Sequence, residues 1–259
     1  MVLVRSNRPM QAVQGSLAGL PLRFKLEGQQ AWGLVGFSSY APTGPRQLLV
    51  QATTEKDQSA RATTTVAVVP EEFELEQIWL PPDQGALLEP AVIQAEWDQL
   101  SAITSVFRPE RFWSGPFLAP AQGEVSSEYG ARRSYNGGPA NSAHEGYDIA
   151  AEAGNPVVAA NAGVVVLAQE WKVRGNAVIV DHGMGVYSGY YHLSEINVTP
   201  GQRVTKGQLL GIVGESGLAT GPHLHWDMIV LGVHTAPLEW TQYPFLELPA
   251  QPTPAAASG

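Results

Sequence analysis

The sequence predicts a mostly β protein built from two domains. Its 259 residues include 27 Gly and 20 Pro, and only 15% are charged, a composition that favours short strands and turns over long helices. Val and Thr occur in short alternating runs, the pattern of strands that bury one face. A chain of this length can bury two separate hydrophobic cores.

Residues 1–70 form the first predicted domain. Apolar and polar residues alternate in the runs at 20–26 and 63–69, and turn-forming residues gather between them at 41–45 and 55–58. Short alternating strands joined by such turns predict an immunoglobulin-like β-sandwich.

Residues 71–116 are predicted to connect the two domains. Within them Ile93, Trp97, Leu100 and Thr104 follow a helical spacing, and Pro90 stands where a helix would begin. We therefore expect one amphipathic helix whose apolar side packs against a neighbouring domain.

Residues 117–245 form the second predicted domain. Glycines bound several apolar runs, which predict strands at 163–167, 177–180, 187–193, 208–213 and 223–230. Residues 246–259 are rich in Pro, Ala and Ser, and we expect this tail to be disordered.

Composition excludes several classes of function. The net charge is -9, and no cluster of Lys or Arg is present that could neutralise a phosphate backbone, so no nucleic-acid partner is expected. The chain has no Cys, so a transition metal would be held by His and carboxylate groups. Neither a signal peptide nor a transmembrane segment is recognisable, and we expect the chain as written to be soluble.

All six histidines lie in the second half of the chain. His144 is followed four residues later by Asp148, but Gly146 between them disfavours the helix of the His-Glu-x-x-His metalloproteases. A turn or an irregular strand could still bring both side chains to one ion. Taken alone, this pair is a weak indication of a metal site.

A second group is more suggestive. In a strand that begins at His223, the side chains of His223, His225 and Asp227 share one face. This face is either part of a site or an ordinary polar outer surface. His192 ends another predicted strand, where it could belong to the same site or donate a hydrogen bond to a backbone carbonyl.

Taken in order, these motifs resemble the lysostaphin/LytM-type zinc metallopeptidases over residues 117 to 240. The matching positions are His144, Asp148, Gly154-Asn155-Pro156, Gly163, Gly175-Asn176, Asp181-His182-Gly183, Tyr190, His192-Leu193, Gly201, Val204, Lys206-Gly207-Gln208, Gly211, Gly214 and Thr220-Gly221-Pro222-His223-Leu224-His225.

The resemblance implies an antiparallel metallopeptidase domain of the duplicated-hybrid-motif type and an active site with one zinc ion per chain. His144, Asp148 and His225 would bind the ion, and a water molecule or substrate oxygen would take the fourth position. His192 and His223 would act in acid–base catalysis beside that water.

The family's usual substrate is bacterial peptidoglycan, so the resemblance implies an endopeptidase that cuts stem peptides or cross-bridges. It also implies an extracellular or cell-envelope location, with an export signal that is not in the chain as written. The alternative is a non-catalytic wall-binding or amidase-activating module. Such modules typically lack one or more of the five site residues, whereas this sequence has all five.

Other polar residues have weaker assignments. Tyr190 could bind the oxyanion or simply pack in a strand. Arg132 and Arg133 could contact a substrate carboxylate or cover the rim of a groove. We expect His182 to be structural and His234 to lie on the surface.

Overall fold

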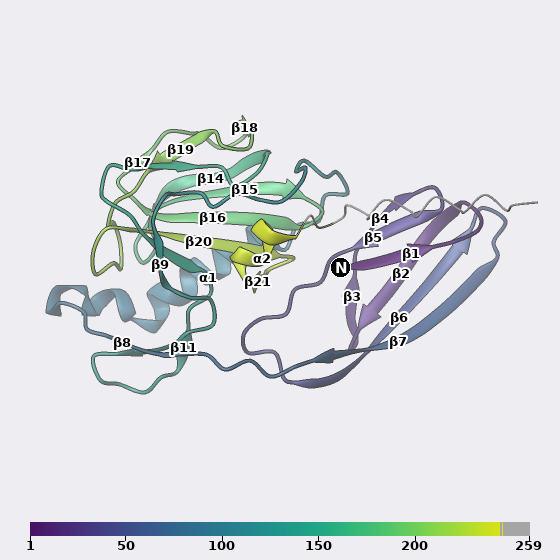
Figure 1. Ribbon diagram of the computed structural model, residues 1–259, viewed down its shortest axis with the longest axis horizontal. Helices are drawn as coiled ribbons and strands as arrows, with labels where there is room; N and C mark the ends of the chain where they lie inside the picture. Colours follow the sequence, from purple (N-terminus) through teal and green to yellow (C-terminus); the bar gives the residue numbers. More distant parts are fainter. Residues whose placement is uncertain (244, 246–259) are drawn as a thin grey trace, which may run out of the picture.

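The computed structural model describes residues 1–243 and 245. Figure 1 shows an elongated molecule, with the C-terminal strands at one end and the N-terminal strands at the other. The mostly β fold class is confirmed. The predicted tail at 246–259 lies outside the described residues.

The N-terminal part contains two antiparallel sheets. One has the order β1-β5-β4 and the other the order β3-β2-β6-β7. Their bounds are β1 Val2–Arg5, β2 Met10–Leu17, β3 Leu20–Leu22, β4 Phe24–Glu27, β5 Gln30–Gly33, β6 Gly44–Thr54 and β7 Ser59–Val68. Leu17, Leu22 and Leu48 form a small buried cluster with neighbouring apolar side chains. The immunoglobulin-like type of this region stays a prediction, as do the domain boundaries.

The connector contains the predicted helix and two further elements, a strand and a 3-10 helix. The helix α1 spans Pro90–Thr104, with Pro90 in its first turn, and it buries Leu100 and Thr104. Before it come the strand β8 (Leu75–Ile78) and the 3-10 helix η1 (Pro82–Leu88), which the sequence pattern did not reveal. β8 pairs in parallel with β10 (Arg132–Tyr135), so the connector adds a strand to the C-terminal half.

The C-terminal half is organised around an eight-stranded sheet with the order β18-β14-β15-β16-β20-β12-β9, in which β21 also pairs with β20. The bounds are β9 Glu124–Ser127, β12 Tyr147–Ala150, β14 Gly163–Trp171, β15 Gly175–Gly183, β16 Val186–Leu193, β18 Arg203–Val204, β20 His223–Val230 and β21 Val233–Thr235. Smaller elements flank it: β11 Ser142–Ala143, β13 Pro156–Val158, β17 Glu195–Ile196, β19 Leu209–Ile212 and α2 Pro237–Gln242. Each of the five predicted strands coincides with one of these strands.

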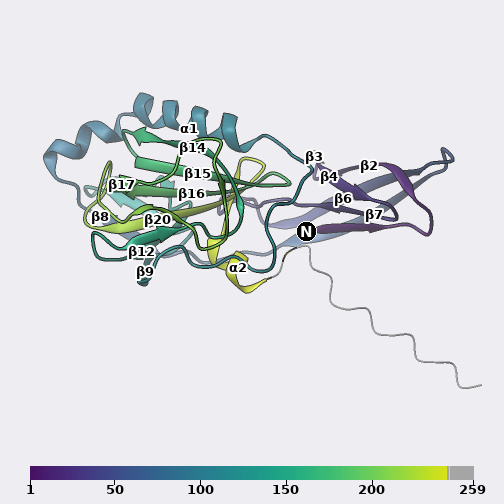
Figure 2. The ribbon, with the colours of Figure 1, turned by 90° about the horizontal axis from the view of Figure 1, so that it is seen from above.

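Apolar layers cover both faces of the sheet. On one face Leu100 of α1 packs with Ile179, Tyr187 and Ile229, and Figure 2 shows α1 lying across β14, β15 and β16. The larger core on the other face also takes in Trp32 and Leu34, from the N-terminal part. Because both faces are covered, the central strands are buried along most of their length and form a firm support for polar groups at the strand ends.

Among the described residues, no helix is both long and apolar enough to cross a membrane.

Candidate metal centre

Three side chains meet on the large sheet, two from its neighbouring inner strands and one from a loop. Asp148 on β12 and His225 on β20 are direct partners in an antiparallel ladder. His144 lies in the loop between β11 and β12. A Cβ atom at Gly146 would approach the Asp227 carboxylate to 2.4 Å, so the loop can fold back toward β20 only with glycine there. This local structure excludes the helical motif, as the sequence predicted.

The ligand atoms of the three residues converge closely. Asp148 Oδ1 lies 2.7 Å from His225 Nδ1 and 3.0 Å from His144 Nε2. The two nitrogens are 2.9 Å apart. Tetrahedral zinc with ligands at about 2.0–2.1 Å needs ligand atoms roughly 3.3 Å apart, so a small shift outward would place all three around one ion.

The hydrogen bonds of His144 and His225 on the ring sides that face away from Asp148 are those expected of metal ligands. His144 Nδ1 lies 3.1 Å from the Glu128 carbonyl oxygen, and His225 Nε2 lies 2.7 Å from Asp227 Oδ1. A carbonyl and a carboxylate accept protons, so these two nitrogens donate. In the neutral form of each ring, the opposite nitrogen then turns a lone pair toward Asp148. Three acceptors that face one point repel each other unless a cation lies between them. The residues therefore fit a divalent metal ion.

The electrostatics favour positive charge at the same point. Burial alone would lower the pKa of His225, but the carboxylates of Asp227 and Asp148 outweigh it and raise that pKa to about 9. Burial alone would raise the pKa of Asp148, yet His144 and His225 hold it well below its usual range. Burial lowers the pKa of His144 to about 4, so this ring is neutral at pH 7 and its lone pair is available.

Arg133 holds the predicted ligand Asp148 in place. The Arg133 guanidinium donates to Asp148 Oδ2 at 2.7 Å, to Ser127 Oγ at 2.8 Å and to Glu76 of β8 at 3.0 Å. Arg133 therefore holds a predicted metal ligand, a role that the sequence did not suggest, and its substrate-binding and groove-rim roles stay predictions. Arg132 instead packs between aromatic rings of the N-terminal part and the connector.

Asp227 contacts His225 at Nε2, on the side of the ring that faces away from Asp148. Its second oxygen, Oδ2, lies 3.1 Å from Nε2 of His234. His234 is only 4% exposed, so the expectation of a surface position is wrong. The hairpin that joins β20 to β21 places His234 opposite Ile229 and beside Asp227. The shared strand face could have identified Asp227 from sequence, but no local pattern marked His234.

The other two predicted site residues lie beside this cluster. The ring centres of His192 and His223 are 4.7 Å apart, and His223 Nε2 lies 3.9 Å from Asp148 Oδ1. His192 Nδ1 donates to the Ser216 carbonyl and His223 Nδ1 to the Gly221 carbonyl, each at 2.8 Å. Both rings therefore keep Nε2 as the unprotonated nitrogen when neutral. Burial, followed by the nearby His223 and His225, lowers the pKa of His192 to about 3.

Tyr190 and His182 lie away from the cluster. Tyr190 is buried in the larger core, and its hydroxyl accepts from the Ala160 N–H at 2.8 Å. The packing interpretation therefore holds and the oxyanion interpretation does not. His182 is buried too, with Nδ1 2.8 Å from the Ala162 carbonyl and Nε2 2.7 Å from Ser188 Oγ, which agrees with a structural role.

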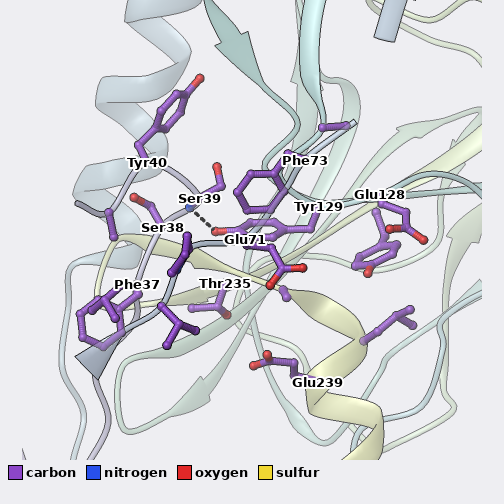
Figure 3. Close-up of a pocket in the computed structure, with 18 of the residues that line it drawn as sticks. Phe37, Ser38, Ser39, Tyr40, Glu71, Phe73, Glu128, Tyr129, Thr235 and Glu239 are labelled. Carbon is purple, nitrogen blue, oxygen red and sulfur yellow. Dashed lines mark hydrogen bonds between the residues drawn. The ribbon is translucent and has the colours of Figure 1, made fainter. Parts of the chain in front are cut away.

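A cavity of about 1000 Å³ lies between the N-terminal part and the C-terminal sheet, and none of the five predicted site residues is among its described lining. Figure 3 shows aromatic rings and carboxylates around it, including Phe73, Glu71 and Glu239. The Tyr129 hydroxyl accepts from the Ser39 N–H and donates to the His234 carbonyl, each at 2.9 Å. Tyr129 therefore joins the two halves of the molecule.

Known proteins resemble this chain most strongly around the metal centre. Residues 142–237 match peptidase family M23. Peptidoglycan DD-endopeptidase ShyA of Vibrio cholerae is 40% identical over 108 residues, which are 42% of this chain and 25% of that protein. The matched region thus spans about a quarter of that relative.

Solved structures extend the comparison. The catalytic domain of EnpA, a prophage-encoded M23 protein of Enterococcus faecalis, is 32% identical over 46% of this chain and 94% of its own, with a TM-score of 0.41. A peptidase M23 structure from Pseudomonas aeruginosa covers 93% of this chain and 92% of its own, with 26% identity and a TM-score of 0.67. The sheet that carries the His-Asp-His cluster is thus of the metallopeptidase class. The chain belongs to peptidase family M23.

Proposed function

We propose that this protein is a zinc-dependent endopeptidase that hydrolyses peptide bonds in the stem peptides or cross-bridges of bacterial peptidoglycan. The observation that carries the proposal is the convergence of His144, Asp148 and His225 on one point, with two further histidines beside it. Related proteins support the substrate class, since ShyA is named a peptidoglycan DD-endopeptidase and Mpg of Neisseria meningitidis a DD-carboxypeptidase/endopeptidase.

His144, Asp148 and His225 would hold one zinc ion per chain. Two neutral nitrogens and one carboxylate oxygen are the ligands typical of a catalytic zinc that keeps one position open. When bound, the ion polarises the carbonyl of the scissile peptide bond and makes a water molecule acidic near neutral pH. Arg133 and Asp227 would keep two of these ligands oriented from behind.

His192 and His223 would manage the protons of the reaction. Their Nδ1 atoms are held by carbonyl groups, whereas no hydrogen bond to either Nε2 atom is found among the described residues. One Nε2 can therefore accept a proton from the attacking water and pass it to the leaving amine. Once protonated, either ring can donate a hydrogen bond to the oxygen on which negative charge develops. No covalent bond between enzyme and substrate is required.

The proposed substrate places the protein in the cell envelope or outside the cell. Peptidoglycan stem peptides are extended chains, and the side chains of His223 and His225, each 16% exposed, are the parts of the candidate centre that such a chain would meet. Neither a nucleic acid nor a membrane-spanning segment has a part in this proposal.

The experiment that tests the proposal combines metal analysis with product analysis. We expect the purified protein to bind one zinc ion per chain and to release peptide fragments from defined muropeptides, which mass spectrometry will identify. The His225→Ala variant serves as the control and should show neither property. Zinc binding without cleavage of any muropeptide, or the absence of both, would instead favour a non-catalytic wall-binding module.

A further inference from the structure

His192 has a backbone conformation that its side chain does not favour. Its φ angle is 60°, in the left-handed region, where a residue other than glycine is uncommon. Strain of this kind persists only where the surrounding structure holds the residue in place. The contacts around His192 are therefore as important for the proposed chemistry as the imidazole itself.

The turn between β14 and β15 holds His192 on one side. The His192 N–H donates to the Arg174 carbonyl at 3.0 Å. The neighbouring Val173 carbonyl accepts from the Leu218 N–H at 2.8 Å, which ties the same turn to the segment of Ser216. Ser216 in turn accepts the Nδ1 proton of His192. The position of this turn thus sets both the backbone and the ring of His192.

A buried carboxylate on α1 fixes that turn. Glu96 is 4% exposed, and its oxygens accept from the Val173 N–H at 2.6 Å and the Arg174 N–H at 3.2 Å. The Arg174 guanidinium donates to the same carboxylate at 3.3 Å and lies 4.8 Å from the ring centre of Trp97 on the same helix. A buried carboxylate is costly unless it is paired and hydrogen-bonded, and among the described residues the hydrogen-bond partners of Glu96 belong to this turn.

We propose that Glu96 is a positioning residue for His192, acting through the backbone of Val173 and Arg174. The inference rests on the proposed function, in which His192 transfers protons. Because α1 lies outside residues 142–237, the matched family region does not itself contain this support. The connector helix thereby becomes part of the catalytic unit.

Two variants of the zinc-loaded full-length protein test the role of Glu96. Glu96→Ala removes the three hydrogen bonds between this carboxylate and the turn. We expect kcat to fall about ten- to a hundredfold, the range for groups that orient the residues of a site from behind, with zinc affinity and KM unchanged. Glu96→Gln retains one carbonyl acceptor and should lose less. The matched control is Gln99→Ala, which removes another hydrogen bond of α1, from Trp171 Nε1–H, and should leave kcat unchanged.

Amide hydrogen exchange measured by NMR adds a readout that does not depend on activity. In Glu96→Ala the His192 amide should exchange at least about tenfold faster, while the Ile179 amide in the sheet core stays protected. Unchanged kcat and unchanged exchange in a folded Glu96→Ala protein would overturn the proposal. Equal losses in Gln99→Ala would overturn it as well, because they would reflect a general loosening of α1. If the wild-type protein cleaves no peptide, the proposed function fails, and the exchange data alone decide the positioning role.

Discussion

Among the single residues of the candidate centre, His225 has the most demanding environment. Its two nitrogens lie 2.7 Å from two different carboxylates, those of Asp148 and Asp227. Nδ1 faces Asp148 and the predicted metal position, and Nε2 on the opposite side of the ring contacts Asp227, which fixes the orientation of the ring. His192 and His223 have no such carboxylate at Nδ1, since both use backbone carbonyls there. This difference distinguishes His225 from His192 and His223, whereas His144, the other predicted histidine ligand, also has a backbone carbonyl at Nδ1.

Substitutions at these histidines should therefore have two distinct effects. We expect His225→Ala to abolish stoichiometric zinc binding, because only two of the three predicted ligands, His144 and Asp148, would remain. His192→Ala and His223→Ala should keep the metal but lower kcat roughly a hundredfold or more, the scale for loss of an acid–base or oxyanion partner. Zinc content by mass spectrometry and steady-state cleavage of muropeptides measure both effects. Full activity in either of the latter variants would contradict the roles assigned here.

His182 gives a pH dependence that is independent of the metal. Burial lowers its pKa to about 4 in the folded protein, against about 6.5 in an unfolded chain. Above pH 6.5 the ring is neutral in both states. As the pH falls from 6.5 to 4, the unfolded chain takes up a proton that the folded protein resists, so the free energy of unfolding falls.

Urea denaturation at pH 7 and pH 4.5 measures this contribution. We expect the loss of stability on acidification to be smaller in His182→Gln than in the wild type, by at most about 1.4 kcal/mol for each pH unit. The comparison between the two proteins removes the effects of other titrating groups. Equal losses in both proteins would show that His182 is not the buried neutral group described above.

At the level of elements, the ladder between β12 and β20 creates the centre. Strand periodicity alone placed His225 and Asp227 on one face, and it did so correctly. It could not give the register that sets Asp148 opposite His225, because strand pairing depends on contacts between distant segments. β8 was missed for a similar reason, since four residues that pair in parallel with β10 have little pattern of their own.

The packing of α1 offers a test at this scale. Leu100 is buried against Ile179, Tyr187 and Ile229, so Leu100→Ala should lower the free energy of unfolding by about 2–5 kcal/mol. Gln94→Ala, on the exposed side of the same helix, should change it by no more than about 0.5 kcal/mol. Denaturation in urea compares the two variants. Similar costs in both would show that α1 does not rest on the sheet through Leu100.

In the molecule as a whole, the sequence was most informative where residue type and order are tightly constrained. The five site residues and the sheet that carries them were recognisable because their motifs recur in a fixed order. The junction between the two halves was not, since its contacts involve isolated residues such as Tyr129, Trp32 and Leu34. Nothing in their local pattern indicates so distant a partner, since Ser39 and Tyr129 are 90 residues apart in the sequence.

Removing residues 1–69 tests how independent the C-terminal half is. This deletion retains β8, and with it the contact of Glu76 with Arg133, so zinc binding and muropeptide cleavage should persist or increase. The melting temperature should fall, because Trp32 and Leu34 leave the larger core. Removing residues 1–80 also deletes β8, and it should weaken zinc binding. A protein that loses all cleavage on the shorter deletion would place the functional part in the N-terminal half instead.

The short link between the two halves has a further consequence. Only residues 69–74 separate the end of β7 from the start of β8, and fully stretched they reach roughly 25 Å. β8 pairs with the strand that contains Arg133. Even if the N-terminal part could rotate freely, the end of β7 would therefore remain within about that distance of β8. A ligand bound by the N-terminal strands would therefore stay near the candidate metal centre, at an effective concentration on the order of millimolar.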